Sequence, residues 1–174
     1  KTGDDYLLHE KGYMDKPLVF LDQLGFVYNL DYSKIAISRG QGEPLSKYFQ
    51  IQDGISIIGM HLLTKKLSIL TMSDRGYGFI CLQEDLFVKN KKGKTLLRTK
   101  DSLAVKSVTV DLDTDLYYLI ITSAGYMLIS EIKNIPILSK GRGVKLINIP
   151  KASDETIIFS TVLKKGQSLS FSYD

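Results

Sequence analysis

The 174-residue sequence is poor in the residues from which many catalytic and metal sites are built. It has one cysteine and two histidines, so it can form no internal disulfide and no site rich in histidine ligands. Cys81 lies inside an apolar run, as expected of a small buried side chain in a protein of a reducing compartment. We expect His9 and His61 to be structural or surface residues.

Long hydrophobic runs are also missing. The longest apolar stretch, residues 55–63, is interrupted by Ser56 and His61 and is too short to cross a bilayer. No signal-peptide pattern opens the chain. The sequence therefore predicts a cytoplasmic protein without a membrane-spanning segment. Because the chain begins in the middle of a pattern, we expect it to be a piece of something longer.

Complete catalytic motifs are absent as well. Residues 93–95 end like a phosphate-binding loop, but Val88 stands where that loop needs a glycine. Residues 76–78 begin like a dinucleotide fingerprint, but Cys81 takes the place of its third glycine. The sequence therefore predicts no catalytic residue, no metal ligand and no bound cofactor.

What the sequence does contain is one pattern written three times, with a period of about 50 residues. Gly25, Gly76 and Gly125 each separate two short apolar runs rich in β-branched and aromatic residues, which is typical of a β-hairpin. A second glycine follows after 17 or 18 residues. These second glycines are Gly42, Gly93 and Gly143.

Each repeat is expected to supply about four strands and no helix longer than a single turn. Hairpins are predicted over residues 18–30, 67–82 and 116–129. Further strands are predicted over residues 45–49, 95–97 and 144–149, and over residues 55–63, 105–110 and 156–162. Single helical turns are predicted over residues 82–86 and 130–135.

Four-stranded units of this length favour an all-β, propeller-like ring of blades. Three repeats are too few to close such a ring, so we expect about three complete blades plus partial blades at each end, with open sheet edges. Residues 1–174 form one fold in this interpretation. Its parts are the end of a preceding blade at 1–15, blades at 16–65, 66–115 and 116–165, and the start of a further blade at 166–174.

Charge is mildly positive overall and strongly segregated along the chain. The formal net charge is +4, yet residues 89–106 hold seven basic side chains against one acid, and residues 133–151 hold five against none. Segregated positive charge is the electrostatic footprint of polyanion binding. The alternative is a solvated, lysine-rich surface without a partner.

The basic side chains recur in register with the second glycine of each repeat. Glycines let a backbone approach a partner closely, and flanking Lys or Arg neutralise phosphates, although the glycines could also serve only as bends. The residues predicted to contact phosphates are Arg39, Lys47, Lys89, Lys91, Lys92, Lys94, Arg98, Lys100, Lys133, Lys140, Arg142, Lys145 and Lys151.

Three segments carry a resemblance to a known family. Residues 39–45, 73–79 and 138–150 closely resemble the C-terminal domain of the A subunit of bacterial topoisomerase IV, more than the equivalent domain of the related gyrase. The resemblance runs over nearly the whole chain. It departs from the family at Val144, where the family usually has asparagine.

The resemblance implies a β-pinwheel, in which propeller-like blades exchange strands with their neighbours. It implies a bacterial, chromosome-associated domain that binds double-stranded DNA along a positive rim, bends it and positions it for strand passage. The parent enzyme would be a heterotetramer of A and B subunits that uses Mg²⁺ and ATP, while this fragment would cleave nothing. The rival interpretations are a propeller used for protein–protein contact and a propeller hydrolase, for which the sequence offers no set of polar groups.

Overall fold

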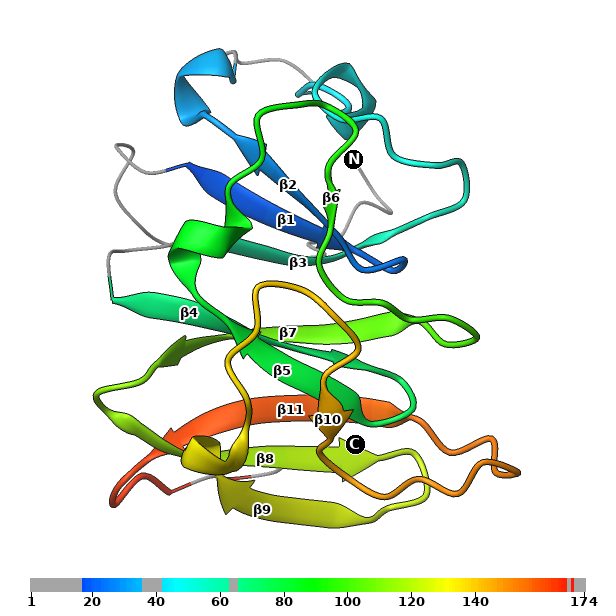
Figure 1. Ribbon diagram of the computed structural model, residues 1–174, viewed down its shortest axis with the longest axis vertical. Coiled ribbons are helices and arrows are strands. Elements are labelled where there is room, and N and C mark those ends of the chain that lie inside the picture. Colours follow the sequence, from blue (N-terminus) through cyan, green and yellow to red (C-terminus); the bar gives the residue numbers. More distant parts are fainter. Residues whose placement is uncertain (1–16, 36–41, 63–65, 169, 171–174) are drawn as a thin grey trace.

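The computed structural model describes residues 17–35, 42–62, 66–168 and 170. Three antiparallel sheets follow one another along the long axis of the molecule (Figure 1). The first sheet has the strand order β3 (Ile57–Leu62), β1 (Leu18–Asp22), β2 (Phe26–Leu30), β6 (Lys94–Thr95). The second has the order β10 (Val144–Lys145), β5 (Tyr77–Cys81), β4 (Leu67–Ser73), β7 (Ala104–Asp111). The third has the order β11 (Ile157–Lys164), β8 (Asp115–Thr122), β9 (Met127–Glu131).

The three predicted hairpins are confirmed as β1–β2, β4–β5 and β8–β9. Most residues of β1, β2, β4 and β5 are buried on both faces of their sheets, and a polar residue ends the first strand of each hairpin. In the first hairpin this residue is Asp22, whose carboxylate accepts hydrogen bonds from the amides of Leu24 and Phe26 and from the hydroxyl of Tyr28. Ser73 and Thr122 hold the corresponding place and accept more weakly from the amides at the start of the second strand. Each hairpin turn is therefore closed by its own side chain.

Two short strands cross from one repeat to the sheet of the repeat before it. The exchange strands β6 and β10 pair with β2 and β5 respectively. The carbonyl of the preceding hairpin glycine anchors each one, since Gly25 O accepts from Leu96 N at 2.8 Å and Gly76 O accepts from Leu146 N at 2.7 Å. The first two sheets are thus completed by strands that belong to the following repeat, as the pairs Phe26–Thr95 and Gly78–Val144 show.

A glycine before each exchange strand makes this close approach possible. Gly143 has φ +77°, and a Cβ built on it would lie 2.1 Å from the carbonyl oxygen of Gly78. A side chain is excluded both by the left-handed backbone and by the facing strand.

One predicted strand is wrong. Residues 45–49 do not pair with another strand, because Leu45–Lys47 forms a single 3-10 turn, η2, after Pro44. The ring of Phe49 packs instead on Phe20, 5.3 Å between ring centroids, and on Tyr28, 5.0 Å away. The predicted turns over 82–86 and 130–135 are confirmed as η3 (Gln83–Leu86) and η4 (Ile132–Asn134), and a further turn, η1 (Tyr32–Lys34), was not predicted.

The core lies in layers between the sheets. One cluster, which includes Val27 and Phe79, fills the space between the first and second sheets, and another, which includes Met72 and Ile120, fills the space between the second and third. The outer face of the third sheet is uncovered by the described residues, so Met127 is 59% exposed and Ile129 is 51% exposed. The all-β architecture of the sequence prediction is confirmed, with three strands in the third sheet where the others have four.

Candidate nucleic-acid interface

The backbone segments that carry most of the predicted basic residues lie side by side. The amide of Arg98 donates to Gly141 O at 2.7 Å, and the amide of Gly141 donates to Leu96 O at 2.9 Å. The segments around β6 and β10 therefore run along the same side of the first two sheets (Figure 1). This arrangement brings the basic residues of the second and third repeats into neighbouring positions.

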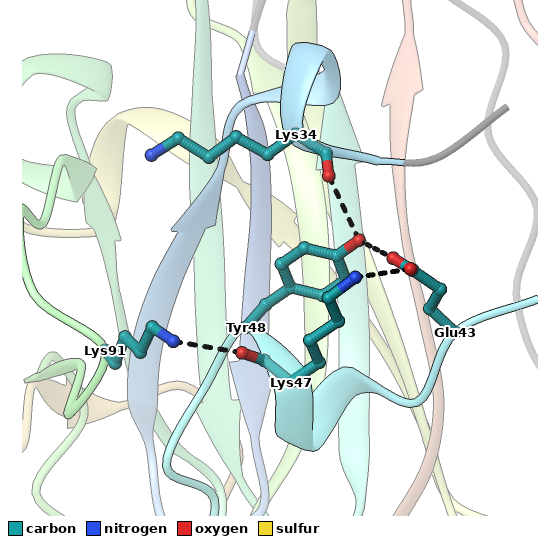
Figure 2. Close-up of polar contacts among 5 residues, drawn as sticks. All are labelled: Lys34, Glu43, Lys47, Tyr48 and Lys91. Carbon is teal, nitrogen blue, oxygen red and sulfur yellow. Dashed lines mark hydrogen bonds and ion pairs between the residues drawn. The ribbon is translucent and has the colours of Figure 1, made fainter.

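Four of the predicted residues have carboxylate or carbonyl partners that reduce their availability, namely Lys47, Lys91, Lys94 and Lys133. Lys47 is ion-paired with Glu43, and this hydrogen bond raises the pKa of the Lys47 ammonium (Figure 2). Lys133 lies 2.9 Å from Glu131, whose hydrogen bond raises the pKa of Lys133 in the same way. The half-buried Lys94 donates from Nζ to Asp85 O at 2.7 Å, so its ammonium holds the fold together.

A small polar cluster surrounds the turn η2 (Figure 2). Tyr48 donates its hydroxyl to Lys34 O and contacts Glu43, and Lys91 Nζ donates to Lys47 O at 3.1 Å. Lys91 therefore connects the second repeat to the turn η2 of the first repeat. Arg39, the remaining predicted residue of the first repeat, lies outside the described residues.

The other predicted cations are exposed, and within the described part of the chain no carboxylate pairs with any of them. These unpaired cations are Lys89, Lys92, Arg98, Lys100, Lys140, Arg142, Lys145 and Lys151. Lys145 also donates from Nζ to Asn148 Oδ1 at 2.7 Å, but it has no carboxylate partner in the described residues. Exposed cations without a carboxylate partner are the side chains that can exchange small counterions for phosphates.

Half of these cations line one hollow of about 450 Å³ at the junction of the second and third repeats. We call it the basic pocket. It is lined by Arg75, Tyr77, Thr99, Lys100, Asp101, Ser102, Arg142, Lys145, Ile149 and Lys151.

Tyr77, one of the residues that line the basic pocket, was missed by the sequence analysis. The guanidinium carbon of Arg142 lies 3.7 Å from the ring centroid of Tyr77, and Lys145 Nζ lies 6.0 Å from the same centroid. The strand exchange creates this contact, because Lys145 in β10 is the register partner of Tyr77 in β5. A recurrent aromatic after the hairpin glycine was the available signal, but its partner is invisible until the pairing is known.

Arg75 is a second residue that the sequence analysis missed. Its guanidinium donates to four backbone carbonyls of the loop after β10, at distances between 2.7 and 3.2 Å. The acceptors are the carbonyls of Pro150, Lys151, Ser153 and Glu155. Arg75 therefore fixes the loop that carries Lys151 at the edge of the basic pocket.

The described residues offer little that would support metal binding or nucleophilic catalysis. No three Asp, Glu, His or Cys side chains among them are close enough to hold a metal ion, and none of their helices could span a membrane. Burial raises the pKa of the Cys81 thiol to about 12, so it stays protonated. His61 is buried against Ser107, 2.8 Å from its Oγ, and burial lowers the pKa of its imidazole to about 4.

Comparison with known proteins finds relatives among the gyrase and topoisomerase IV A subunits. Residues 68–103 and 116–162 match the family described as DNA gyrase C-terminal domain, beta-propeller. The chain is 39% identical over 153 residues to the DNA topoisomerase 4 A subunit of Haemophilus influenzae. The aligned region covers 88% of this chain and 20% of the relative. The Escherichia coli K12 protein of the same name is 38% identical over 152 residues, with 87% and 20% covered.

Solved structures agree with the sequence relatives. The E. coli ParC C-terminal domain superposes with a TM-score of 0.83 at 34% identity, covering 94% of this chain and 69% of that one. The C-terminal domain of a DNA topoisomerase IV superposes with a TM-score of 0.77 at 16% identity, covering 87% and 48%, which shows a shared fold. The chain spans about a fifth of the length of the curated relatives it matches.

Proposed function

Because the chain belongs to the family of C-terminal domains found in gyrase and in the topoisomerase IV A subunit, whose fold is the β-pinwheel, we propose that it binds and bends double-stranded DNA. The observation that carries this proposal is the pairing of cationic segments from successive repeats. The segments around β6 and β10 are hydrogen-bonded to each other along the same side of the first two sheets (Figure 1), and these segments carry most of the unpaired lysines and arginines.

Phosphate neutralisation supplies the affinity in this proposal. The contacting set is the thirteen residues named from the sequence, with the eight unpaired cations contributing most. Blades offset around an axis present these charges on an arc, so a bound duplex must curve. Bending a short duplex costs on the order of 1–6 kcal/mol, which the additional contacts offset. Sequence preference should be slight, because phosphate contacts carry no base information.

We propose that the whole protein is the A subunit of a bacterial topoisomerase IV, which acts with the B subunit in ATP-dependent strand passage, decatenation and relaxation of supercoils. The domain would position duplex DNA for that reaction in the cytoplasm and catalyse no step itself. Mg²⁺ and ATP would be used by the parent enzyme outside this fragment, with ATP bound by the B subunit.

The test is a titration of fluorescent duplex DNA at several salt concentrations. The logarithm of the binding constant should fall linearly with the logarithm of the salt concentration, with a slope of about −0.9 for each neutralised phosphate. Lys92→Gln and Lys140→Gln should each make the slope shallower by about one. Lys66→Gln is the matched control, because Lys66 lies beside Asp113 and outside the predicted set. An affinity that hardly changes with salt would refute the proposal.

A second candidate function is a protein-contact module, which the exposed Met127 and Ile129 on the third sheet favour. Charge reversal at Lys92, Lys140 and Arg142 separates the two candidates. It should abolish a DNA gel shift if the chain is a DNA-binding domain. If the chain is only a protein-contact module, the native chain should give no shift. Lys94 is unsuitable for this experiment because its ammonium holds Asp85 O.

A further inference from the structure

We propose that the basic pocket anchors one backbone phosphate, and that Tyr77 is the positioning residue that holds Arg142 ready for it. The proposal deepens the proposed function and rests on it for the source of the phosphate, which is duplex DNA. It singles out one place on the cationic surface and assigns a role to an uncharged residue.

The first support is uncompensated charge in a formed hollow. Five cationic side chains and one carboxylate, Asp101, line the basic pocket. Within the described residues, none of these five cations is ion-paired, in contrast to Lys47 and Lys133. An anion entering here gains attraction from several directions and displaces no internal carboxylate partner.

The second support is the stacking of Arg142 on Tyr77. A guanidinium lying 3.7 Å over a ring is held with its plane fixed and its N–H edge free to form paired hydrogen bonds with a phosphate. No acceptor in the described part of the chain takes a hydrogen bond from the Arg142 side chain. The side chain is therefore ordered before the ligand arrives, which lowers the entropy cost of binding.

The third support is backbone strain at Lys100, which also lines the basic pocket. Lys100 has φ +50° and is the one residue other than glycine with a positive φ in the described ranges. It lies in a turn closed by a hydrogen bond from Ser102 N to Thr99 O at 3.0 Å. Strained residues of this kind cluster at ligand sites, because the surrounding structure must enforce them.

Arg75 stabilises the pocket by fixing one of its loops, and it has no direct contact with the phosphate in this proposal. Its N–H groups are directed to four carbonyls of the loop at residues 150–155, which places Lys151 at the edge of the pocket. The basic pocket is therefore lined by a stacked Arg142–Tyr77 pair, by the strained Lys100 and by a loop that Arg75 fixes.

The experiment combines two probes on the whole 174-residue chain. Inorganic phosphate, followed by NMR, should cause saturable shifts at the Arg142 Nε–H and the Tyr77 amide, and smaller shifts elsewhere. In DNA titrations, Tyr77→Leu should weaken binding about 2- to 5-fold, while Tyr77→Phe, which keeps the ring, should bind like the native chain. Arg142→Gln should make the salt slope shallower by about one.

The distinguishing result is the coupling between the two residues. If Tyr77 acts by positioning Arg142, Tyr77→Leu should have no further effect on DNA affinity in an Arg142→Gln chain. Arg142→Lys provides a variant that leaves Tyr77 in place. It keeps the charge but loses the planar stack, so affinity should fall while the salt slope stays unchanged.

Each contrary outcome has its own meaning. Equal losses from Tyr77→Leu in both backgrounds, or diffuse phosphate shifts over all exposed lysines, would overturn the pocket while leaving DNA binding intact. A native chain that binds no duplex at any salt concentration would refute the proposed function and, with it, DNA as the source of the phosphate. Lys66→Gln should match the native chain in every measurement.

Discussion

Gly143 and Gly125 have nearly the same backbone conformation in very different surroundings. Their φ angles are +77° and +82°, but a Cβ on Gly143 would meet Gly78 O at 2.1 Å, whereas one on Gly125 would meet nothing within 4 Å. Gly125→Ala should therefore lower the free energy of unfolding by about 1 kcal/mol, the cost of the left-handed backbone. Gly143→Ala should lower it by about 3 kcal/mol, because the facing strand must also move. Urea denaturation of both variants measures the difference, and equal losses would show that the close approach has no energetic role.

His61 should make stability depend on pH. Burial against Ser107 lowers the pKa of its imidazole from 6.5 to about 4, so the unfolded chain binds the proton more tightly than the folded one. The contribution of neutral His61 is thus complete above the unfolded pKa and is lost as pH falls toward the folded pKa, by about 3 kcal/mol in total. Urea midpoints between neutral pH and about pH 4 measure this loss. His61→Gln should flatten the dependence, and an equally steep fall in that variant would assign it to other groups.

At the scale of elements, Arg75 should decide the order of the loop that follows β10. Arg75→Met removes donors to four carbonyls, and hydrogen bonds from charged groups contribute about 1.5–3 kcal/mol. We expect faster amide exchange across residues 150–157 and little change in the first sheet. Hydrogen–deuterium exchange measured by mass spectrometry tests this. Lys66→Met is the control for losing an exposed cation, and unchanged exchange in the loop would show that other contacts hold it.

The elements that the sequence predicts best are the hairpins, whose two strands are adjacent in the sequence and pair with each other. Short runs of β-branched and aromatic residues on both sides of Gly25, Gly76 and Gly125 predict the hairpins, because strand and turn signals lie together in the chain. Strands were also predicted over residues 95–97 and 144–149, but β6 and β10 are only two residues long and their partners lie in the preceding repeat, so the local pattern gave neither their length nor their pairing. For the same reason the sequence marks Arg142 as a candidate but cannot show the ring of Tyr77 beneath it.

Residues 45–49 show that equivalent positions in different repeats need not form the same structure. The segment after Gly42 has a leucine three residues after the glycine, as do the segments of β6 and β10 with Leu96 and Leu146, and this equivalence predicts a strand over residues 45–49. In the structure Leu45–Lys47 turns back, because Phe49 is buried between Phe20 and Tyr28 and no strand edge in the described residues lies beside the segment. Strand formation here depends on a partner, and the local sequence alone does not impose it.

At the scale of the whole molecule, the third sheet has a face and an edge that the described residues leave open. Met127 and Ile129 correspond in the repeat to Val27 and Ile80, which are 0% and 1% exposed because the next sheet covers them. Exposed apolar faces beside an unpaired strand favour association between molecules. We expect the chain to self-associate at high concentration, with no weakening at high salt.

The double variant Met127→Lys, Ile129→Lys should reduce this association, because it places charge on both the face and the edge strand. Sedimentation velocity over a concentration series measures it. Phe87→Lys is the matched control, since Phe87 is 45% exposed and lies outside the third sheet. If both variants reduce association equally, the cause is net charge and not the open sheet.

Because β6 and β10 pair with strands of the preceding repeat, a cut between repeats cannot divide the chain into parts with complete sheets. A break in the turn at residues 112–114 would give one half that lacks β10 and another whose β10 has no β5 to pair with. We expect two such halves, produced separately, to remain incomplete alone and to recover order when mixed, because each carries the missing piece of the other. Split-protein complementation is thus a direct consequence of a strand that belongs by sequence to one repeat and by hydrogen bonding to the one before it.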